Sequence, residues 1–477
     1  MKIIHLALII ILLPDLVLSQ EVNQVRIYEA REIVTLDKNY PMATSVAIKK
    51  DRIIDVGAVE QLRKKFPKAQ LDTRFSEDVM VPGLIEHHVH PFLAAITMES
   101  NVIAIEDWNL PGNQSKGVRD REAYLNRLKV EEQLLAEAEK PFVTWGFHHY
   151  FHGKLSRQDL DKISMTRPIV VIHRSFHEFI LNSSALVYFG ITKELVNNFD
   201  EEAKEYANFE KGHFSEQGMV SILPYLMKYL AAPDRLIKGL QKTEKYLHNN
   251  GVTMVANPGA YSVKPIQDAK NFVFGDEETP FRSFYIPSGL LMAEQYPAEE
   301  LVEKSKEFLS WGKGKVEYLP LQIKLFTDGA MYSQNMVMRD GYLDGHQGAW
   351  LMQEKIYREA FQKFWDACSH GCFCVCKTTS TAARRVEAAR PKKNNKPREP
   401  LLHTPSTPDP RSDGGRRSAP SQGRPGPERP AAIAPPTVPW PPYKGGSGGN
   451  ICPPSRNTSS NSLRVVPART VITSSSG

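Results

Sequence analysis

VPGLIEHHVHP, residues 81–91, is the stretch from which the fold of this chain can be inferred. An apolar run leads into a Pro-Gly pair, and three histidines follow within four positions. On a β-strand the side chains of residues i and i+2 point to the same face, so His88 and His90 are expected to project together. Two imidazoles side by side at the end of a strand can ligate one divalent cation. The alternative is a chance cluster of histidines on a surface loop.

The segments that follow the histidines alternate between apolar, strand-like runs and helical patterns. The strand-like runs are RPIVVIHRS (167–175), GVTMVANPG (251–259), TPFRSFYIP (279–287) and LQIKLFTDG (321–329). Helical patterns lie around 119–140, 231–249 and 298–310. This order of strands and helices indicates an α/β protein with a parallel sheet. In that class the chemistry lies at the C-terminal ends of the strands, where the histidines of the opening stretch are expected.

Residues 24–80 have a different pattern, with short alternating runs of β-branched residues broken by charged turns. This pattern predicts a small sheet in front of the α/β region. The first 19 residues, MKIIHLALIIILLPDLVLS, combine one lysine with an apolar run and predict a signal peptide that is cleaved near Ser19. An uncleaved membrane anchor is the alternative, although the apolar run is short for a bilayer. We therefore expect a secreted protein, or one in the secretory lumen, with no stable membrane span after cleavage.

The C-terminal region differs from the rest in charge and composition. From Lys377 onward the chain carries 17 Lys and Arg against 5 Asp and Glu, whereas residues 1–376 carry 43 against 49. The mildly acidic front gives no indication of a nucleic-acid surface. All five cysteines lie at or after Cys368, which excludes a disulfide framework for the main body. Residues 373–477 are rich in Pro, Arg and Ser and predict a disordered tail, either a natural basic linker or the product of a lost reading frame or a splicing error.

The opening stretch resembles the first-strand signature of the metal-dependent amidohydrolase superfamily, which usually reads Pro-Gly-Phe-Ile-Asp-x-His-x-His. Leu84 stands for the Phe and Glu86 for the Asp. Residues 155–192, with their Arg-Pro, His and Asn-Ser landmarks, are similar to the insert of the type-three amidohydrolases, the N-substituted formamide deformylase-like branch. NNGVTMVANPG and LQIKLFTDGAMYSQ resemble two strands of the same branch. The resemblance runs from about residue 25 to about residue 371.

This resemblance implies a TIM-type (β/α)₈ barrel over residues 81–372, with an insert around 110–220. Residues 20–80 would form the N-terminal part of a small β-sandwich domain. The resemblance also implies a centre of one or two divalent metal ions, with zinc the expected metal. Its ligands would be His88, His90 and a carboxylated lysine, which Lys324 matches. A neutral amine in an apolar strand can react with CO₂ to give a carbamate, which ligates as a carboxylate does. The alternative is a lysine that reaches solvent or pairs with Asp328.

Other positions give weaker indications of a substrate pocket. His177 matches the family's His before Asn-Ser, and Trp145 precedes a run that contains His148, His149 and His152. Packing without any contact to substrate is an equal alternative for these side chains. Asp328 precedes a glycine at a strand end, where a role in the turn alone is the alternative. Glu216 resembles a Glu of the family pattern.

The sequence lacks the family's last catalytic elements. The family pattern has a His-x-x-Gly-Asp strand after the helix that ends near Gly371, and an Asp on the last barrel strand that acts as general base. In this chain CFCVCKTT stands where the His-x-x-Gly-Asp strand is expected. The later residues of the same types, His403, Asp409 and Asp413, lie in Pro-rich sequence with no strand pattern around them. The catalytic residue is therefore unknown, and the barrel is expected to be incomplete.

Two functions remain open from the sequence. The first is a metal-dependent hydrolase of non-peptide carbon–nitrogen bonds in small amides or formamides, impaired by the missing strands. The second is a catalytically dead, secreted binding protein of the same ancestry.

Overall fold

The computed structural model describes residues 24–137, 139–320, 322–329, 335–343 and 345–367, and the backbone of residues 375–377. The predicted signal peptide lies outside the described residues, and so does the predicted tail apart from that short backbone segment. Among the described residues no helix is both long and apolar enough to cross a bilayer.

The N-terminal β-rich region forms a four-stranded sheet. Its strands are β1 (Val25–Val34), β2 (Met42–Lys49), β3 (Arg52–Gly57) and β4 (Gln70–Met80), in the order β3-β2-β1-β4. β1 pairs antiparallel with β2 and parallel with β4, and α2 (Val59–Lys65) joins β3 to β4. Ile27 and Ala47 pack with Leu62 of α2 on one face, and Ile33 and Val46 pack on the other. The alternation seen in the sequence thus buries apolar side chains on both faces of the sheet.

A parallel sheet carries the residues of the opening stretch. Its strands are β5 (Leu84–Glu86), β14 (Val252–Ala260), β15 (Arg282–Pro287) and β16 (Val316–Tyr318), in the order β16-β15-β14-β5. All neighbouring pairs are parallel. β17 (Lys324–Phe326) continues the series, because Lys324 forms a parallel bridge with Ser288 just after β15. β18 (Val375–Lys377) pairs parallel with β17.

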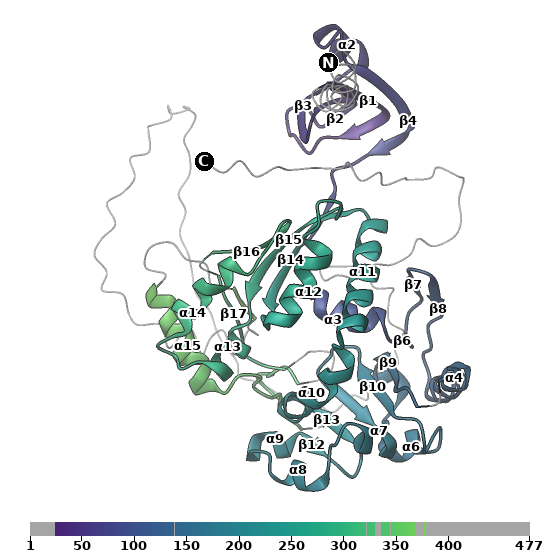
Figure 1. Ribbon diagram of the computed structural model, residues 1–477, viewed down its shortest axis with the longest axis vertical. Coiled ribbons are helices and arrows are strands. Elements are labelled where there is room, and N and C mark those ends of the chain that lie inside the picture. The colour runs from purple at the N-terminus through teal and green to yellow at the C-terminus, as the bar shows by residue number, and fades with distance from the viewer. Residues whose placement is uncertain are drawn as a thin grey trace, which may run out of the picture. The chain divides into compact units, whose positions relative to one another are not determined.

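Helices connect the strands of this series. They are α11 (Pro233–Asn249), α12 (Lys264–Phe274), α13 (Gly289–Gln295), α14 (Leu301–Glu307) with the 3-10 turn η1 (Phe308–Ser310), and α15 (Glu354–Ala367). Figure 1 shows α11 and α12 alongside β14 and β15. α11 buries Leu236, Leu240 and Leu247, a spacing that puts them on one helical face. At Gly239 a Cβ would lie 2.3 Å from the carbonyl oxygen of Ala95, so this glycine allows α11 to pack closely on α3 (Pro91–Met98).

Residues 99–230 contain a second sheet, in which parallel and antiparallel strand pairs are mixed. Its order is β12-β13-β11-β10-β9-β6. The strands are β6 (Asn101–Val102), β9 (Phe142–Phe147), β10 (Ile169–His173), β11 (Glu178–Leu181), β12 (Ala207–Asn208) and β13 (His213–Ser215). β6, β9 and β10 are parallel, and the other pairs are antiparallel. An apolar run such as that of β10 shows that a strand is buried, but it does not show to which sheet the strand belongs.

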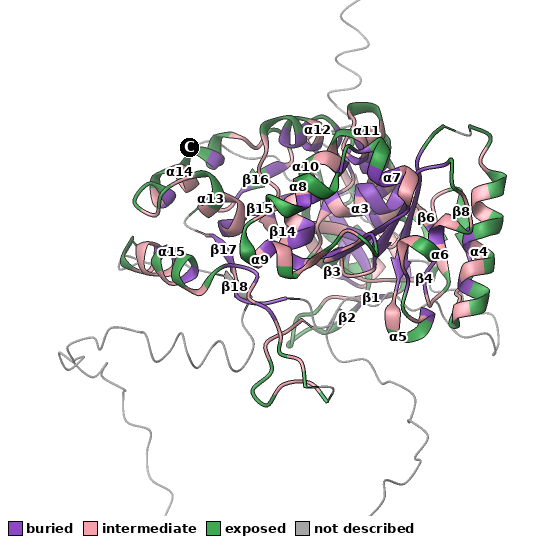
Figure 2. Ribbon diagram, turned by 90° about the horizontal axis from the view of Figure 1, so that it is seen from below, coloured by how far each residue is buried: buried purple, intermediate pink, exposed green. Residues whose placement is uncertain are grey.

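Short helices and a hairpin surround this second sheet. The hairpin consists of β7 (Trp108–Leu110) and β8 (Asn113–Ser115). The helices are α4 (Arg121–Leu134), α5 (His149–His152), α6 (Arg157–Asp161), α7 (Ser183–Tyr188), α8 (Lys193–Asn197), α9 (Glu201–Glu205) and α10 (Glu216–Leu230). In Figure 2, buried residues gather on α3, whereas α4 is largely exposed and buries only Tyr124 and Leu128. The described chain is thus a mixed α/β fold whose main apolar core joins residues of both larger sheets.

β5 lies at one edge of its sheet. Among the described residues it has one hydrogen-bonded neighbour, β14. The side chains of Leu84 and Ile85 are 50% and 62% exposed. An apolar strand that ends a sheet with exposed side chains is unusual in a folded protein.

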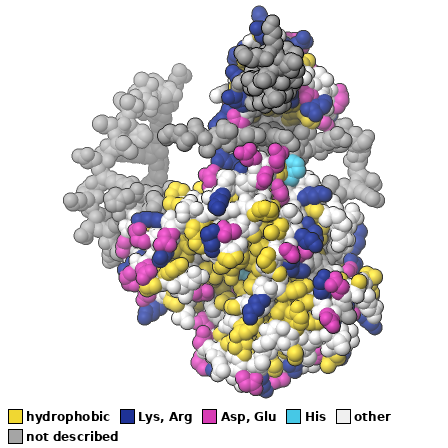
Figure 3. Space-filling model, in the orientation of Figure 1, with side chains coloured by type: hydrophobic (Ala, Val, Ile, Leu, Met, Phe, Trp, Pro, Cys, Tyr) yellow, Lys and Arg dark blue, Asp and Glu magenta, His cyan; other side chains and the backbone are white. Residues whose placement is uncertain are grey.

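Charged side chains of both signs are interspersed over the face drawn in Figure 3.

Candidate functional site

His88 and His90 lie just beyond the C-terminal end of β5, and not within the strand. The strand ends at Glu86, His90 precedes the first turn of α3, and Pro91 opens that helix. The two imidazoles nevertheless lie together, with ring centroids 5.2 Å apart and rings nearly perpendicular. The predicted pairing is therefore present, although the alternation of a β-strand is not its cause. The loop between strand and helix brings the rings together, aided by a hydrogen bond from the His88 N–H to the Glu86 carboxylate at 2.9 Å.

Lys324, the third predicted ligand, lies beside this pair. Its Nζ is 3.1 Å from His88 Nε2, although the two residues are 236 positions apart in the sequence. The lysine is 2% exposed, whereas His88 is exposed, so the site opens to solvent on the side of the histidine. β17 thus brings its first residue to the strand end from which the histidines project.

The surroundings of Lys324 are shaped to hold its long side chain. Its Nζ lies 5.0 Å from the ring centroid of Phe326. Gly259, with φ +88°, lies against it, and a Cβ there would be 3.4 Å from Lys324 Cδ and 3.0 Å from the Phe326 ring. Glycine is therefore favoured at this position both by the backbone conformation and by the space it leaves for the lysine.

A fourth residue, Asn257 of β14, orients His90. The Nδ1 of His90 lies 3.0 Å from Asn257 Oδ1. An amide oxygen only accepts, so this contact makes Nδ1 the protonated nitrogen and leaves the lone pair on Nε2. Such an outer hydrogen bond is the usual means of fixing the tautomer of a metal-ligating histidine.

These residues fit the divalent metal that the resemblance implies. Two imidazoles at one strand end supply nitrogen ligands, and the buried amine of Lys324 adjoins one of them. A carbamate on that amine would add the anionic oxygen ligand that zinc and similar ions accept.

Asp328, which the sequence offered as a weak candidate for the substrate pocket, is buried, and both of its carboxylate oxygens accept hydrogen bonds. Its Oδ1 accepts from the Thr327 hydroxyl at 2.9 Å, and its Oδ2 accepts from the Val337 N–H at 2.9 Å. Asp328 also forms an antiparallel bridge with Trp350. These contacts tie the segment after β17 to the strand, which is the turn role that was the alternative in the sequence.

His177 forms a dyad with Glu216. Its Nδ1 lies 2.9 Å from the Glu216 carboxylate, whose other oxygen accepts from Asn335 Nδ2 at 2.8 Å. The Glu216 side chain is fully buried, and that of His177 is 17% exposed. Glu216 begins α10 with φ +39°, a conformation that non-glycine residues adopt only under constraint. The carboxylate holds the imidazole so that its other nitrogen is the one presented to the surroundings.

Trp145 and His152 pack within the structure. Trp145 is 7% exposed and lies edge-on to Trp108 at 5.2 Å. His152 is fully buried, stacks on Tyr124 at 4.1 Å, and its Nε2 lies 2.8 Å from the Val118 carbonyl oxygen. These contacts match the packing alternative for both side chains.

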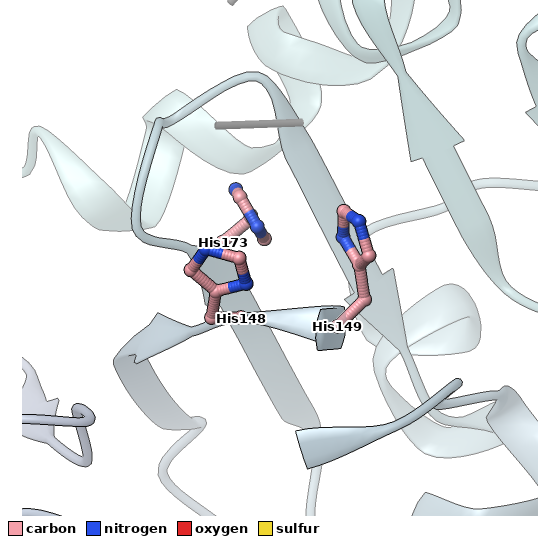
Figure 4. Close-up of side chains that lie close together, drawn as sticks. All are labelled: His148, His149 and His173. Atoms are coloured by element: carbon pink, nitrogen blue, oxygen red, sulfur yellow. The ribbon is translucent and has the colours of Figure 1, made fainter. Parts of the chain in front are cut away.

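A second group of histidines lies in the mixed sheet. His148, His149 and His173 each offer one ring nitrogen, and these three atoms lie within 4.8 Å of one another. Figure 4 shows the three imidazoles gathered over the ends of the neighbouring strands β9 and β10. Burial lowers the pKa of His148 to about 4 and that of His173 to about 3, so both imidazoles are neutral near pH 7.

Sequence reasoning missed part of this arrangement. It named His148 and His149 but did not connect them with His173, because nothing in the sequence shows that β9 pairs with β10. It also gave no role to Asn257, which stands in an unremarkable Ala-Asn-Pro-Gly segment.

The residues expected at the last strands lie mostly outside the described part. β18 takes the place beside β17, and its described backbone covers Val375–Lys377. His403, Asp409 and Asp413, which the sequence places in Pro-rich segments, lie outside the described residues.

Comparison with known proteins gives two curated relatives at low identity. Protein LONG AFTER FAR-RED 3 of Arabidopsis thaliana is 23% identical over 323 residues, which are 65% of this chain and 52% of that protein. The exoenzymes regulatory protein AepA of Pectobacterium carotovorum is 23% identical over 338 residues, which are 67% of each chain. The chain thus spans about half the length of the Arabidopsis protein.

Two solved structures are similar in fold. They are uncharacterized metal-dependent hydrolases, one from Pyrococcus horikoshii and one from Pyrococcus furiosus. The first has a TM-score of 0.52 at 14% identity, and the match covers 76% of this chain and 67% of the Pyrococcus horikoshii chain. The second has a TM-score of 0.50 at 16% identity, and the match covers 76% of this chain and 69% of the Pyrococcus furiosus chain.

The family comparison covers most of the chain. Residues 77–436 match the amidohydrolase family, from just before the histidine stretch to well beyond residue 371, where the resemblance was expected to stop. This match includes β5, the mixed sheet, and β14 to β18 with their helices. The chain belongs to the amidohydrolase family.

Proposed function

We propose that this chain is a metal-dependent hydrolase of small-molecule amides or formamides, with its metal centre at His88, His90 and Lys324. The observation that carries the proposal is the 3.1 Å approach of Lys324 Nζ to His88 Nε2. A buried amine beside an imidazole, at a strand end in an amidohydrolase, supports a carboxylated lysine that ligates zinc together with the two histidines. The likeness in fold to two metal-dependent hydrolases from Pyrococcus is consistent with this chemistry.

The described residues would have separate roles at this metal centre. Asn257 fixes the proton of His90 on Nδ1, and Gly259 with Phe326 forms the apolar wall that holds the Lys324 side chain in place. A bound divalent ion supplies an activated water and polarises the substrate carbonyl. The exposure of His88 leaves a path for the substrate to reach this point from solvent.

We further propose that turnover is low in this chain. The expected general base, an Asp on the last barrel strand, has no counterpart in strand-like sequence. Proton transfer to the leaving nitrogen by a positioned group typically contributes 10²–10⁴-fold to the rate, so its loss would leave binding with little hydrolysis.

The experiment uses the purified full chain supplied with Zn²⁺ and ¹³C-bicarbonate. We expect a ¹³C carbamate signal and bound zinc in the parent, and the loss of both in Lys324→Met. Lys270→Met is the matched control, because Lys270 is also fully buried but lies on α12, and it should keep both signals. His88→Ala should lose zinc binding while remaining folded.

Turnover is measured with the same preparations on N-formyl amines and cyclic amides. A carbamate with bound zinc and slow, His88-dependent hydrolysis supports the proposal. Zinc and carbamate without any hydrolysis would leave a binding protein in place of an enzyme. If Lys324→Met binds zinc as the parent does, the proposed metal centre is wrong.

A further inference from the structure

The three histidines of the mixed sheet lie together at the C-terminal ends of two neighbouring strands. β9 and β10 are parallel, and their register pairs His173 with Phe147. His148 and His149 follow the end of β9, and His173 ends β10. One ring nitrogen of each histidine lies within 4.8 Å of the other two, and Figure 4 shows the rings gathered over the strand ends. Neither strand belongs to the sheet of β5, beyond whose end the first site lies.

Backbone hydrogen bonds determine which nitrogen carries the proton in two of these rings. The Tyr150 N–H donates to His148 Nδ1 at 3.3 Å, and the Ser175 N–H donates to His173 Nδ1 at 3.2 Å. Burial lowers the pKa of His148 to about 4 and that of His173 to about 3, so both rings are neutral near pH 7. A neutral ring whose Nδ1 accepts a hydrogen bond has its proton on Nε2. Both rings therefore present N–H donors, which suit a ligand oxygen and not a cation.

The buried N–H of His173 gives an independent indication of a ligand. His173 is fully buried, and its Nε2 has no hydrogen-bond partner among the described residues. Native proteins seldom leave a buried donor unsatisfied without a function or a bound group. An oxygen of a bound molecule would accept from it. His148 and His149 are only partly buried, so the cluster can be reached from solvent on their side.

We propose that His148, His149 and His173 form a binding site for the amide group of an aromatic amide. The Nε2–H groups of His148 and His173 donate to the amide oxygen, and a ring nitrogen of His149 accepts from the amide N–H. No hydrogen bond to a described residue fixes the tautomer of His149, so this ring can take the form that accepts. The proposal does not depend on the metal centre at the end of β5.

The size of the cluster fits one acceptor oxygen. An oxygen that accepts two N–H groups at about 2.9 Å each, with about 110–120° between the two bonds, needs donors roughly 4.8–5.0 Å apart. The ring nitrogens of the cluster lie within 4.8 Å of one another. An amide oxygen can therefore be held between two of the rings with little movement of either.

The charges around the cluster favour a neutral ligand over an anion. Glu178 is buried, and one of its oxygens lies 3.9 Å from His173 Nδ1 while the other accepts from His213 Nε2 at 2.9 Å. Burial acts to raise the pKa of Glu178, but the hydrogen bond from His213 and the neighbouring histidines lower it overall, so the carboxylate is ionised. Arg174 pairs with Glu106 at 2.9 and 3.1 Å. A carboxylate ligand would be repelled by Glu178, whereas an amide carries no net charge.

Two exposed aromatic side chains beside the cluster indicate an aromatic ligand. Tyr150 is 74% exposed and Phe151 is 37% exposed. Their ring centroids lie 6.5 Å and 5.3 Å from that of His148, and 5.1 Å from each other. Exposed aromatic rings next to polar groups that fix orientation are typical of small-molecule sites. A phenyl group attached to the amide would have these rings to pack against.

The contrasting interpretation is a cluster of histidines that only pack on one another. His149 stacks on His173 with ring centroids 5.5 Å apart, a contact that stabilises the rings without a ligand. This interpretation leaves the Nε2–H of His173 unsatisfied and predicts no preference for an amide over an ester. The two interpretations therefore differ in ligand binding.

The test uses the full-length His88→Ala/His90→Ala variant, so that the first site does not hold the probe through a metal ion. Acetanilide is the probe, phenyl acetate is the matched ester without an N–H, and benzoate is the matched anion. Dissociation constants are measured by ligand-observed NMR titration. We expect acetanilide to bind about tenfold more tightly than phenyl acetate or benzoate.

Substitutions in the same background test each ring. His148→Phe keeps an aromatic ring but removes the donor, and it should weaken acetanilide binding about tenfold, whereas His148→Gln retains an N–H and should stay within about threefold of the starting variant. In His149→Phe, acetanilide and phenyl acetate should bind alike. His248→Phe is the matched control, because His248 is also partly buried but lies near the end of α11, and it should bind acetanilide unchanged. Circular dichroism shows whether all variants are folded.

Three results would overturn the proposal. They are the absence of acetanilide binding at millimolar concentrations, binding that His148→Phe leaves unchanged, and binding of phenyl acetate or benzoate as tight as that of acetanilide. Since the first site is disabled throughout, failure here leaves the function proposed for His88, His90 and Lys324 untouched.

Discussion

Replacement of Glu216 tests whether the dyad with His177 is held by the charge and the backbone of this one residue. Glu216→Ala removes the acceptor of two hydrogen bonds, from His177 Nδ1 and from Asn335 Nδ2. Hydrogen bonds to a charged group contribute about 1.5–3 kcal/mol each, and the group is fully buried, so neither donor gains water in exchange. We expect the free energy of unfolding to fall by about 3–5 kcal/mol.

Glu216→Gly separates the backbone from the side chain. It loses the same two hydrogen bonds, but the φ of +39° is no longer strained once the Cβ is gone. A left-handed conformation costs a residue with a Cβ about 1–2 kcal/mol. The glycine variant should therefore be more stable than the alanine variant by about 1 kcal/mol, although in an ordinary helix the order is the reverse.

Urea unfolding followed by circular dichroism measures both changes. Glu303→Ala is the control, because Glu303 also lies in the first turn of a helix but its side chain is 73% exposed, and its replacement should leave the unfolding midpoint unchanged. The reasoning is refuted if Glu216→Ala lies within about 1 kcal/mol of the parent. It is also refuted if the glycine variant is the less stable of the two.

Three further predictions concern other buried polar groups. Asn257→Leu leaves His90 without its outer hydrogen bond and should weaken Zn²⁺ binding about 10–100-fold in titration calorimetry; unchanged affinity would contradict the orienting role. Arg167 is 5% exposed and donates to Glu132 at 2.7 Å and to nearby carbonyls, so Arg167→Met should lower the free energy of unfolding by about 3–5 kcal/mol, and a loss below 1 kcal/mol would speak against it. Burial lowers the pKa of Lys270 from 10.5 to about 7. Between these two pH values the lysine is protonated in the unfolded chain but neutral in the folded one. The destabilisation caused by burying this lysine is therefore largest below pH 7 and disappears as the pH rises through 10.5. Lys270→Met should therefore be more stable than the parent by roughly 3–5 kcal/mol at pH 6, with the gap closing toward pH 10, and a gap independent of pH would exclude this cause.

Local patterns in the sequence predicted the elements of the fold better than their partners. The helices expected around 231–249 and 298–310 are present as α11 and as α14 with η1, since amphipathic spacing is a property of the segment itself. The division into two larger sheets was not predictable, because strand pairing depends on contacts between segments far apart in the chain.

The same distinction holds for the candidate sites. His88 and His90 could be found because they are two positions apart, and Lys324 because a motif resemblance marked it. The nearness of His173 to His148 depends on the parallel pairing of β9 with β10, which no local pattern reveals. Glu216 could be suspected from the resemblance, but its positive φ and its two hydrogen bonds arise only from the packing of α10 against residues beyond β17.

The exposed edge at β5 is a place where this chain can associate with another chain. Leu84 and Ile85 have exposed apolar side chains on a strand that, among the described residues, pairs on one side only, and such an edge can pair with another extended segment and start β-linked aggregation. Two local features restrain this: the strand is three residues long, and Pro82 has no N–H with which to extend the pairing. The segment that positions the candidate metal ligands is therefore also, among the described residues, a sheet edge with which another extended segment can pair.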